Sequence, residues 1–291
     1  MPKSNIKEDK GRSKMKLRKI KRELLKKSRR RFFNKTMGKK SKIAFISDVH
    51  GNLEALMAVI NDIVKEDVDK IFCCGDSIGY GPNPNECLQL IKELKIDCVR
   101  GNHEEALIKN ECSFTELALK SIQWTARVLT IENYSFLDSL PYSLNYEIDG
   151  KSFTIVHGSN DSPKKFNYID NSIAAERSIY KQHILFVGHS HSPTLFFTGN
   201  CLGYERAFED YSNKKSIIGK EGMHYIVNVG SVGQPRDRDD RACYSIYDLD
   251  KNTIEWKRVE YPVEKTQAKI LEYGLPEFNA TRLKLLVQLY H

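Results

Sequence analysis

The stretch IAFISDVHGN, residues 43–52, decides how the rest of the chain is interpreted. Residues 43–47 form a short apolar run that is typical of a buried strand. Asp48 and His50 follow directly, and residues 52–65 then show the apolar spacing of an amphipathic helix. This strand–turn–helix unit places two side chains able to bind a metal ion just beyond the end of a strand.

The same order is repeated along the chain. Strands are predicted at 70–74 and 96–99 with a helix at 85–92 between them, which indicates a largely parallel sheet with crossover helices. Further helices are predicted at 114–129 and 133–139. Strands follow near 144–148, 152–156, 183–187, 194–197, 224–228, 242–248 and 253–259. These are too many for one doubly wound sheet, so two facing sheets with helices outside are expected, and residues 200–222 are interpreted as an inserted loop or lid.

Residues of the types that bind metals or carry protons gather just after predicted strands. The short motifs are DVH at 48–50, GD at 75–76, GNHE at 101–104, VHG at 156–158 and GHSH at 188–191. Because ligands bind at the carboxyl edge of the strands in α/β sheets, we expect these turns to converge on one site. Cys73 and Cys74 lie within a predicted strand and are expected to pack as small apolar residues.

The collected side chains are two aspartates, one asparagine and four histidines, a set of oxygen and nitrogen donors without sulfur. Such a set suits manganese, iron, nickel or zinc better than calcium or magnesium. Seven donors exceed the four that a structural zinc takes, so two metal ions about 3.5–4 Å apart with one bridging carboxylate are expected. This arrangement is typical of enzymes that displace phosphoryl groups.

The five motifs, in this order, resemble those of the calcineurin-like metallophosphoesterase superfamily over residues 43–259. The segments GYGPNPNEC at 79–87, NVGSVGQPRD at 228–237 and LPEFNATRL at 275–283 are similar to those of its small bacterial and archaeal phosphatase and phosphodiesterase-like members. The resemblance implies an α/β fold, a four-layer αββα sandwich of two mixed sheets flanked by helices. It also implies hydrolysis of phosphate mono- or diesters of a small molecule or nucleotide by a metal-bound hydroxide, with manganese the favoured metal.

Matching the motifs residue by residue implies a role for each position. One metal would be held by Asp48, His50 and His191, the other by Asn102, His157 and His189, with Asp76 between them. His103 would assist the leaving oxygen, which makes His103 and Asp76 the candidate catalytic residues. Arg100 resembles the arginine that grips phosphate in the protein-phosphatase branch, and Arg236 is a second candidate because guanidinium groups match phosphate geometry.

One position departs from the protein-phosphatase pattern. That branch has a second aspartate in GDxxD to support the acid histidine, and Gly79 occupies its place here. This lowers the expectation of phosphoprotein hydrolysis, although a protein phosphatase and a dinucleoside polyphosphate hydrolase remain alternatives. A non-catalytic protein-binding scaffold on the same fold is the alternative of another class.

Charge divides the chain into two domains, a basic extension at 1–42 and an acidic phosphoesterase domain at 43–291. Residues 1–42 hold 19 Lys and Arg against 3 acidic residues, whereas the rest holds 27 against 35. The extension is expected to be flexible or helical, and residues 1–36 would contact nucleic acid, a membrane surface or a protein, so tail-guided nucleic-acid processing is a further alternative. Seven cysteines without a CxxC pair favour a reducing compartment, the cytoplasm, and no segment predicts a transmembrane helix.

Overall fold

The structure is a computed structural model that describes residues 42–110, 114–148, 150–178, 184–198, 205–207, 215–218 and 222–284. The predicted basic extension therefore lies outside the described residues, apart from Lys42. Within the described part of the chain, no helix is long and apolar enough to cross a membrane.

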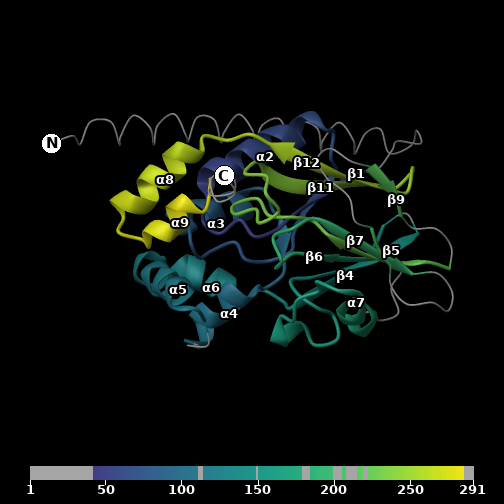
Figure 1. Cartoon of the computed structure of the whole chain (residues 1–291), viewed down its shortest axis with the longest axis horizontal. Coiled ribbons are helices and arrows are strands. Elements are labelled where there is room, and N and C mark those ends of the chain that lie inside the picture. Colours follow the sequence, from purple (N-terminus) through teal and green to yellow (C-terminus); the bar gives the residue numbers. More distant parts are fainter. Residues whose placement is uncertain are drawn as a thin grey trace, which may run out of the picture.

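Two six-stranded mixed sheets form the centre of the molecule (Figure 1). The first has the order β3-β2-β1-β11-β12-β9, and the second has the order β4-β5-β6-β10-β7-β8. The strands of the first sheet are β1 (Lys42–Ile46), β2 (Lys70–Cys73), β3 (Asp97–Cys98), β9 (Lys215–Ile217), β11 (Ala242–Asp248) and β12 (Thr253–Val259). Those of the second are β4 (Ser143–Ile148), β5 (Lys151–Val156), β6 (Ile184–Val187), β7 (Thr194–Thr198), β8 (Glu205–Ala207) and β10 (His224–Asn228).

The pairing explains why the ligand motifs share one edge. β1, β2 and β3 run parallel, and so do β5, β6 and β10, whereas the outer strands pair antiparallel. Parallel neighbours end at the same edge, so the loops that follow β1, β2 and β3 meet each other. The loops after β5 and β6 meet them from the second sheet.

The alternation of side chains in β1 shows how the sandwich is held together. Ile43 and Phe45 point into the core between the sheets, and Ala44 and Ile46 point into the core beneath the helices. The inner core is aromatic: the Phe45 and Phe186 rings stack across the sheets with centroids 3.7 Å apart. This core positions the two strand edges, and hence the ligand loops, against each other.

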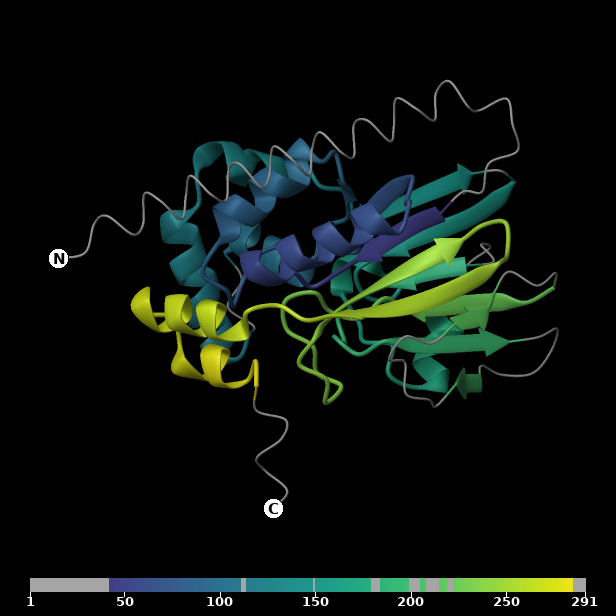
Figure 2. The same ribbon diagram turned by 90° about the horizontal axis from the view of Figure 1, so that it is seen from above.

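Helices cover the outer faces of both sheets. The set comprises α2 (Leu53–Lys65), α3 (Pro84–Glu93), α4 (Asn102–Lys109), α5 (Glu116–Val128), α6 (Ile131–Asp138), α7 (Ser172–Ser178), α8 (Val263–Glu272) and α9 (Glu277–Thr281), with a short 3₁₀ turn at Pro163–Lys165. α2 to α6 share a core with the first sheet, and α7 packs its Ala175 on the second. Both views show α4, α5, α6, α8 and α9 gathered at one end of the two sheets (Figures 1 and 2).

The four-layer αββα sandwich predicted from the sequence is therefore confirmed. Cys73 and Cys74 are buried on opposite faces of the first sheet, as expected. The interpretation of residues 200–222 as a loop was wrong at two places, because β8 pairs with β7 and β9 pairs with β12 and each extends one sheet. Both strands have only three residues, too few for alternation to reveal them.

Candidate metal centre

Five loops at one edge of the sandwich carry the residues singled out by their motifs. Backbone hydrogen bonds join the loops: Asp48 N donates to Gly75 O and Gly188 N donates to His157 O, each at 3.0 Å. All the predicted ligands except Asn102 are less than 9% exposed, and they meet in one cluster: Asp48, His50, Asp76, Asn102, His157, His189 and His191. Charged and polar groups are rarely buried so densely without a partner to bind.

Five of these residues have a left-handed backbone, although none is a glycine. Their φ angles are 51° for Asp48, 47° for His50, 53° for Asp76, 68° for His189 and 59° for His191. Such conformations cost about 1–3 kcal/mol each and persist where the surrounding structure enforces them. The left-handed conformations therefore reduce the stability of the fold. They also direct the five side chains inward, toward one another.

Asp48, His50 and His191 form the first group of donors. The Nε2 atoms of His50 and His191 are 3.1 Å apart, and His191 Nε2 lies 3.3 Å from Asp48 Oδ1. Asp48 Oδ1 is buried and has no hydrogen-bond partner among the described residues. Three donor atoms thus surround one point.

The far side of each imidazole in this group fixes its tautomer. His50 Nδ1 faces Ile78 O at 2.9 Å, and His191 Nδ1 faces Gln234 O at 2.6 Å. A carbonyl oxygen only accepts hydrogen bonds, so both Nδ1 atoms carry the proton. Burial lowers the pKa of both histidines well below the usual value, so the rings are neutral and each Nε2 presents a lone pair. Backbone support of the distal nitrogen is typical of metal-binding histidines.

Asp76, His157 and His189 form the second group, with Asn102 beside it. His157 Nε2 lies 3.3 Å from Asp76 Oδ2 and 2.9 Å from Asn102 Oδ1. Asp76 Oδ2 is also 3.7 Å from His50 Nε2. Asp76 therefore lies between the two groups, where a bridging carboxylate would be required.

The electrostatics of the cluster favour added positive charge. Burial opposes protonation of His157, but the nearby Asp76 carboxylate outweighs it and raises the pKa of His157 to about 10. Burial, helped by the charge of Asp76, raises the pKa of Asp48 to about 7. A bound divalent cation would take the place of these protons, and the imidazole nitrogens and buried carboxylates fit divalent transition metals.

Glu104 is a supporting residue that the motif search did not single out. Its carboxylate accepts hydrogen bonds from the backbone N–H groups of Gly101, Asp76 and Ser77 at 2.7–3.0 Å, and from Ile78 N at 3.2 Å. The bond to Gly101 is half of a capping box at the start of α4. The sequence signal for this role was a glutamate three residues after the position that begins the helix. In the structure the Glu104 carboxylate fixes the Asp76 loop to the start of α4.

His103 lies on the rim of the cluster with its Nε2 3.9 Å from Asp76 Oδ2. Its Nδ1 is buried and has no hydrogen-bond partner among the described residues. A Cβ atom at Gly79 would lie 2.2 Å from this Nδ1, so the ring occupies the space that any side chain at position 79 would need. Burial lowers the pKa of His103 to about 4.

The two predicted phosphate-binding arginines lie in different settings. Arg100 donates to Glu105, to Tyr142 Oη and to the carbonyl oxygens of residues 137 and 138, so most of its guanidinium is engaged beneath the site. Arg236 donates one side-chain hydrogen bond, to Gln234, and its buried Nε, like that of Arg100, has no partner among the described residues. Its backbone N donates to His191 O, which places Arg236 next to the cluster. Arg236 is therefore the better placed of the two.

Two residues at the site were missed by the sequence reasoning. The ring of Tyr168, which is 50% exposed, stacks on His189 with centroids 3.9 Å apart. Arg282 lies over the ring of Tyr80, which in turn contacts His50 and His103. Tyr168 follows VHG by ten residues without any pattern, and the segment that contains Arg282 was noted only as similar to relatives.

Comparison with known proteins agrees with this geometry. Residues 42–252 match the family model described as the calcineurin-like phosphoesterase superfamily domain. An uncharacterised protein of Methanocaldococcus jannaschii is 41% identical over 249 residues, which is 84% of this chain and 98% of that protein.

Solved structures give the same result. A metallophosphoesterase from Sphaerobacter thermophilus is 36% identical, with a TM-score of 0.71 over 86% of this chain and 100% of its own. A hypothetical protein from Pyrococcus horikoshii shares the fold, at 20% identity and a TM-score of 0.69 over 84% of this chain and 97% of its own. The predicted likeness to small bacterial and archaeal members is thus confirmed.

Proposed function

Because the chain belongs to the calcineurin-like phosphoesterase superfamily, and is thus a metal-dependent phosphoesterase, we propose that it hydrolyses phosphate mono- or diesters of small molecules or nucleotides at two divalent cations. The observation that carries this proposal is the pair of buried donor groups on either side of Asp76. Manganese is the metal we favour among the manganese, iron, nickel and zinc ions that such nitrogen and oxygen donors suit.

The residues that would hold the two ions are those of the two groups. Asp48, His50 and His191 would bind one ion, Asn102, His157 and His189 the other, and Asp76 both. Two such cations lower the pKa of water from 15.7 to roughly 7 and offset negative charge on the phosphate oxygens. The left-handed loops would hold the donors in place before any ion arrives, which reduces the reorganisation needed on binding.

His103 and Arg236 would act on the substrate itself. Arg236 would orient the phosphate through its Nε and the free part of its guanidinium, a geometry that suits bidentate contacts. His103 would hydrogen-bond the leaving oxygen, with its ring held between Tyr80 and Phe114 at centroid distances of 4.6 and 5.4 Å. A positioned imidazole of this kind contributes about 10²–10⁴-fold to a rate.

The setting of His103 also favours one class of substrate. No described carboxylate bonds to its Nδ1, and burial outweighs the charge of Asp76 and lowers the pKa of His103 to about 4, so the neutral imidazole is favoured. Esters with acidic leaving groups need less protonation than the serine and threonine alkoxides of phosphoproteins. We therefore place small-molecule esters and nucleotides before phosphoproteins.

The alternatives predicted from the sequence rank lower. A scaffold has no need for a complete set of buried donors, and all seven positions are filled here. The role of residues 1–36 and the domain boundary at residue 42 remain predictions. The cytoplasmic location also remains a proposal, and the five described cysteines, buried and free, are compatible with it.

The test combines metal analysis with a substrate screen. Purified protein loaded with manganese should hold about two ions per chain and should hydrolyse aryl phosphate mono- or diesters. Asp76→Asn should abolish both double occupancy and turnover, because it removes the shared carboxylate. Asp250→Asn is the matched control, since Asp250 is exposed in the β11–β12 turn. A chain that binds no transition metal, or an Asp76→Asn variant as active as the control, would contradict the proposal.

A further inference from the structure

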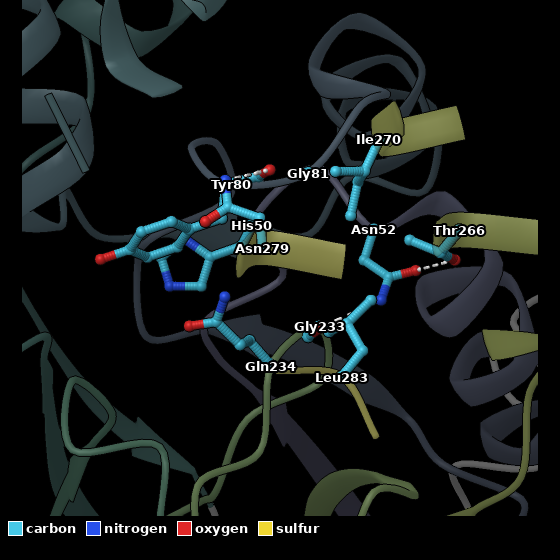
Figure 3. A pocket seen from close by; sticks show the side chains of 10 residues that line it. All are labelled: His50, Asn52, Tyr80, Gly81, Gly233, Gln234, Thr266, Ile270, Asn279 and Leu283. Carbon is cyan, nitrogen blue, oxygen red and sulfur yellow. Dashed lines mark hydrogen bonds between the residues drawn. The ribbon is translucent and has the colours of Figure 1, made fainter. Parts of the chain in front are cut away.

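The two C-terminal helices are fastened to the rim of the metal centre. Thr266 of α8 donates to the side chain of Asn52, which caps α2 directly after the first ligand loop. Asn279 of α9 is 1% exposed, and its Nδ2 donates to Tyr80 O at 3.1 Å and to Ser121 Oγ at 2.9 Å. Figure 3 shows Asn279 and Leu283 lining the same pocket as the rings of Tyr80 and His50. The position of α9 relative to the centre is therefore set by buried hydrogen bonds.

This attachment places a cation beside the donors. Arg282 follows Asn279 by three residues, and its guanidinium carbon lies 5.8 Å from the Tyr80 ring centroid and 5.3 Å from that of Phe278. The Tyr80 ring is 4.7 Å from the His50 ring and 4.6 Å from the His103 ring, centroid to centroid. One aromatic ring thus separates Arg282 from the metal centre.

Arg236 reaches the same pocket, because its guanidinium donates to Gln234 Oε1 at 2.9 Å and Gln234 lines the pocket together with Tyr80. Burial and then the charge of Arg236 lower the pKa of Arg282 to about 10, so the two guanidinium groups repel each other. Among the described residues no carboxylate forms an ion pair with either arginine. Two partly buried cations that have no carboxylate at ion-pair distance among the described residues favour an anion bound between them.

We propose that Arg282, together with Arg236, forms a second anion-binding subsite beside Tyr80, which takes a second phosphoryl group of the same substrate while the first lies at the metal centre, so that the Arg236 guanidinium contacts both groups. The inference rests on the proposed function, and it narrows the substrate class to molecules that carry two phosphoryl groups. A phosphoryl dianion matches two adjacent guanidinium groups better than a single carboxylate does, because each guanidinium offers a planar fork of N–H donors. The two groups could be joined as a phosphoanhydride or as separate esters.

The test compares bisphosphates with monophosphates. Alkanediol bisphosphates of increasing chain length are matched with alkyl monophosphates, and kcat and KM are measured for the manganese-loaded full chain. The wild type should show a KM at least about tenfold lower for the bisphosphate of the right length. Imidodiphosphate, used as a competitor, represents the phosphoanhydride spacing, so the better ligand identifies how the two groups are joined.

Arg282→Gln should bring the KM ratio between bisphosphate and monophosphate close to one, because one charge-assisted contact is worth about a tenfold or larger change in affinity. Arg282→Lys keeps the charge without the planar fork, so its KM ratio should lie between those of the wild type and Arg282→Gln. Lys284→Gln is the matched control, since Lys284 is exposed, two residues away and paired with Glu264. Thermal unfolding of each variant checks that α9 is intact.

The two proposals fail in different ways. If Arg282→Gln is folded and retains the wild-type preference for bisphosphates, the subsite is refuted and the phosphoesterase stands. If the wild type hydrolyses no phosphoester, the proposed function fails, and calorimetric binding of the bisphosphate still tests the subsite. Equal binding by wild type and Arg282→Gln would then refute it, whereas an approximately tenfold weaker binding by the variant would support it.

Discussion

The two ends of the parallel strands β1 and β2 follow opposite rules. At their amino ends charges are paired: Lys42 lies near Glu66, and Lys70 contacts Asp97, which also accepts from Tyr146 Oη at 2.6 Å. At their carboxyl ends Asp48 and Asp76 are buried among histidines in left-handed loops. The first arrangement lowers the free energy of the folded chain, and the second raises it. The comparison teaches that the charges at the amino ends are offset by partners that stabilise the fold, whereas Asp48 at the carboxyl end of β1 is buried with an oxygen that no described residue bonds.

The largest effect that tests this contrast is expected at His103. His103→Asn removes the imidazole at the carboxyl end of β3 and should lower kcat about 10²–10⁴-fold with a much smaller change in KM. The reason is that the ring acts on the leaving oxygen and not on the bound phosphate. Steady-state kinetics on an aryl phosphate gives the value.

The same substitution at the amino end of a strand provides the control. His224 begins β10, on the second sheet, and His224→Asn should leave kcat within about twofold because no chemistry is expected there. If kcat fell by a similar factor in His103→Asn and His224→Asn, the distinction between the carboxyl and amino ends of the strands would fail. An increase in KM alone, with kcat unchanged in His103→Asn, would assign His103 to phosphate binding instead.

A smaller effect is expected from the metal ions on stability. Manganese at about a hundredfold above its dissociation constant should raise the free energy of unfolding by about 3 kcal/mol, because it binds only the folded donor cluster. Urea denaturation with manganese or with a chelator measures the difference. Asp250→Asn, at the opposite end, should show the full increase, whereas His191→Phe should lose at least half of it.

Metal-free His191→Phe sharpens the same point. Replacing this imidazole with an apolar ring removes one of two facing lone pairs but leaves Gln234 O without its donor, so it should cost about 1–3 kcal/mol without metal. A loss of several kcal/mol in the metal-free state would mean that the imidazole stabilises the fold itself. The cluster would then no longer differ from the amino ends.

The sequence predicted what depends on short, local patterns. The alternation in residues 43–46 gave β1 and both of its faces, and ligands directly after strands were brought together by parallel pairing alone. Gly79 was recognised as a missing carboxylate, and the structure adds that His103 occupies its space.

What escaped prediction depends on distant parts of the chain. Arg282 reaches the site only because Asn279 bonds to the backbone of Tyr80, about 200 residues earlier, and no local periodicity encodes that contact. Arg100 shows the reverse case, since its motif predicted a phosphate contact but Glu105, one turn into α4, engages its guanidinium. The candidate metal ligands are therefore encoded by local patterns, whereas the position of Arg282 depends on tertiary contacts.

The smallest predicted effect is at Asp97, at the amino end of β3. Burial alone would raise its pKa, but hydrogen bonds from Lys70 and Tyr146 outweigh it and lower the pKa below 3.8. A depressed pKa in the folded state stabilises the protein above the unfolded pKa, and this contribution is lost as the pH falls through the folded value. Because both side chains of the ion pair are 37% exposed, Asp97→Asn should cost under about 1 kcal/mol at pH 7. Urea denaturation at pH 7 and near pH 3 should show the difference between wild type and variant shrinking in acid, with activity at pH 7 unchanged; a difference that stays constant with pH would show that packing, and not charge, holds this end of the strand together.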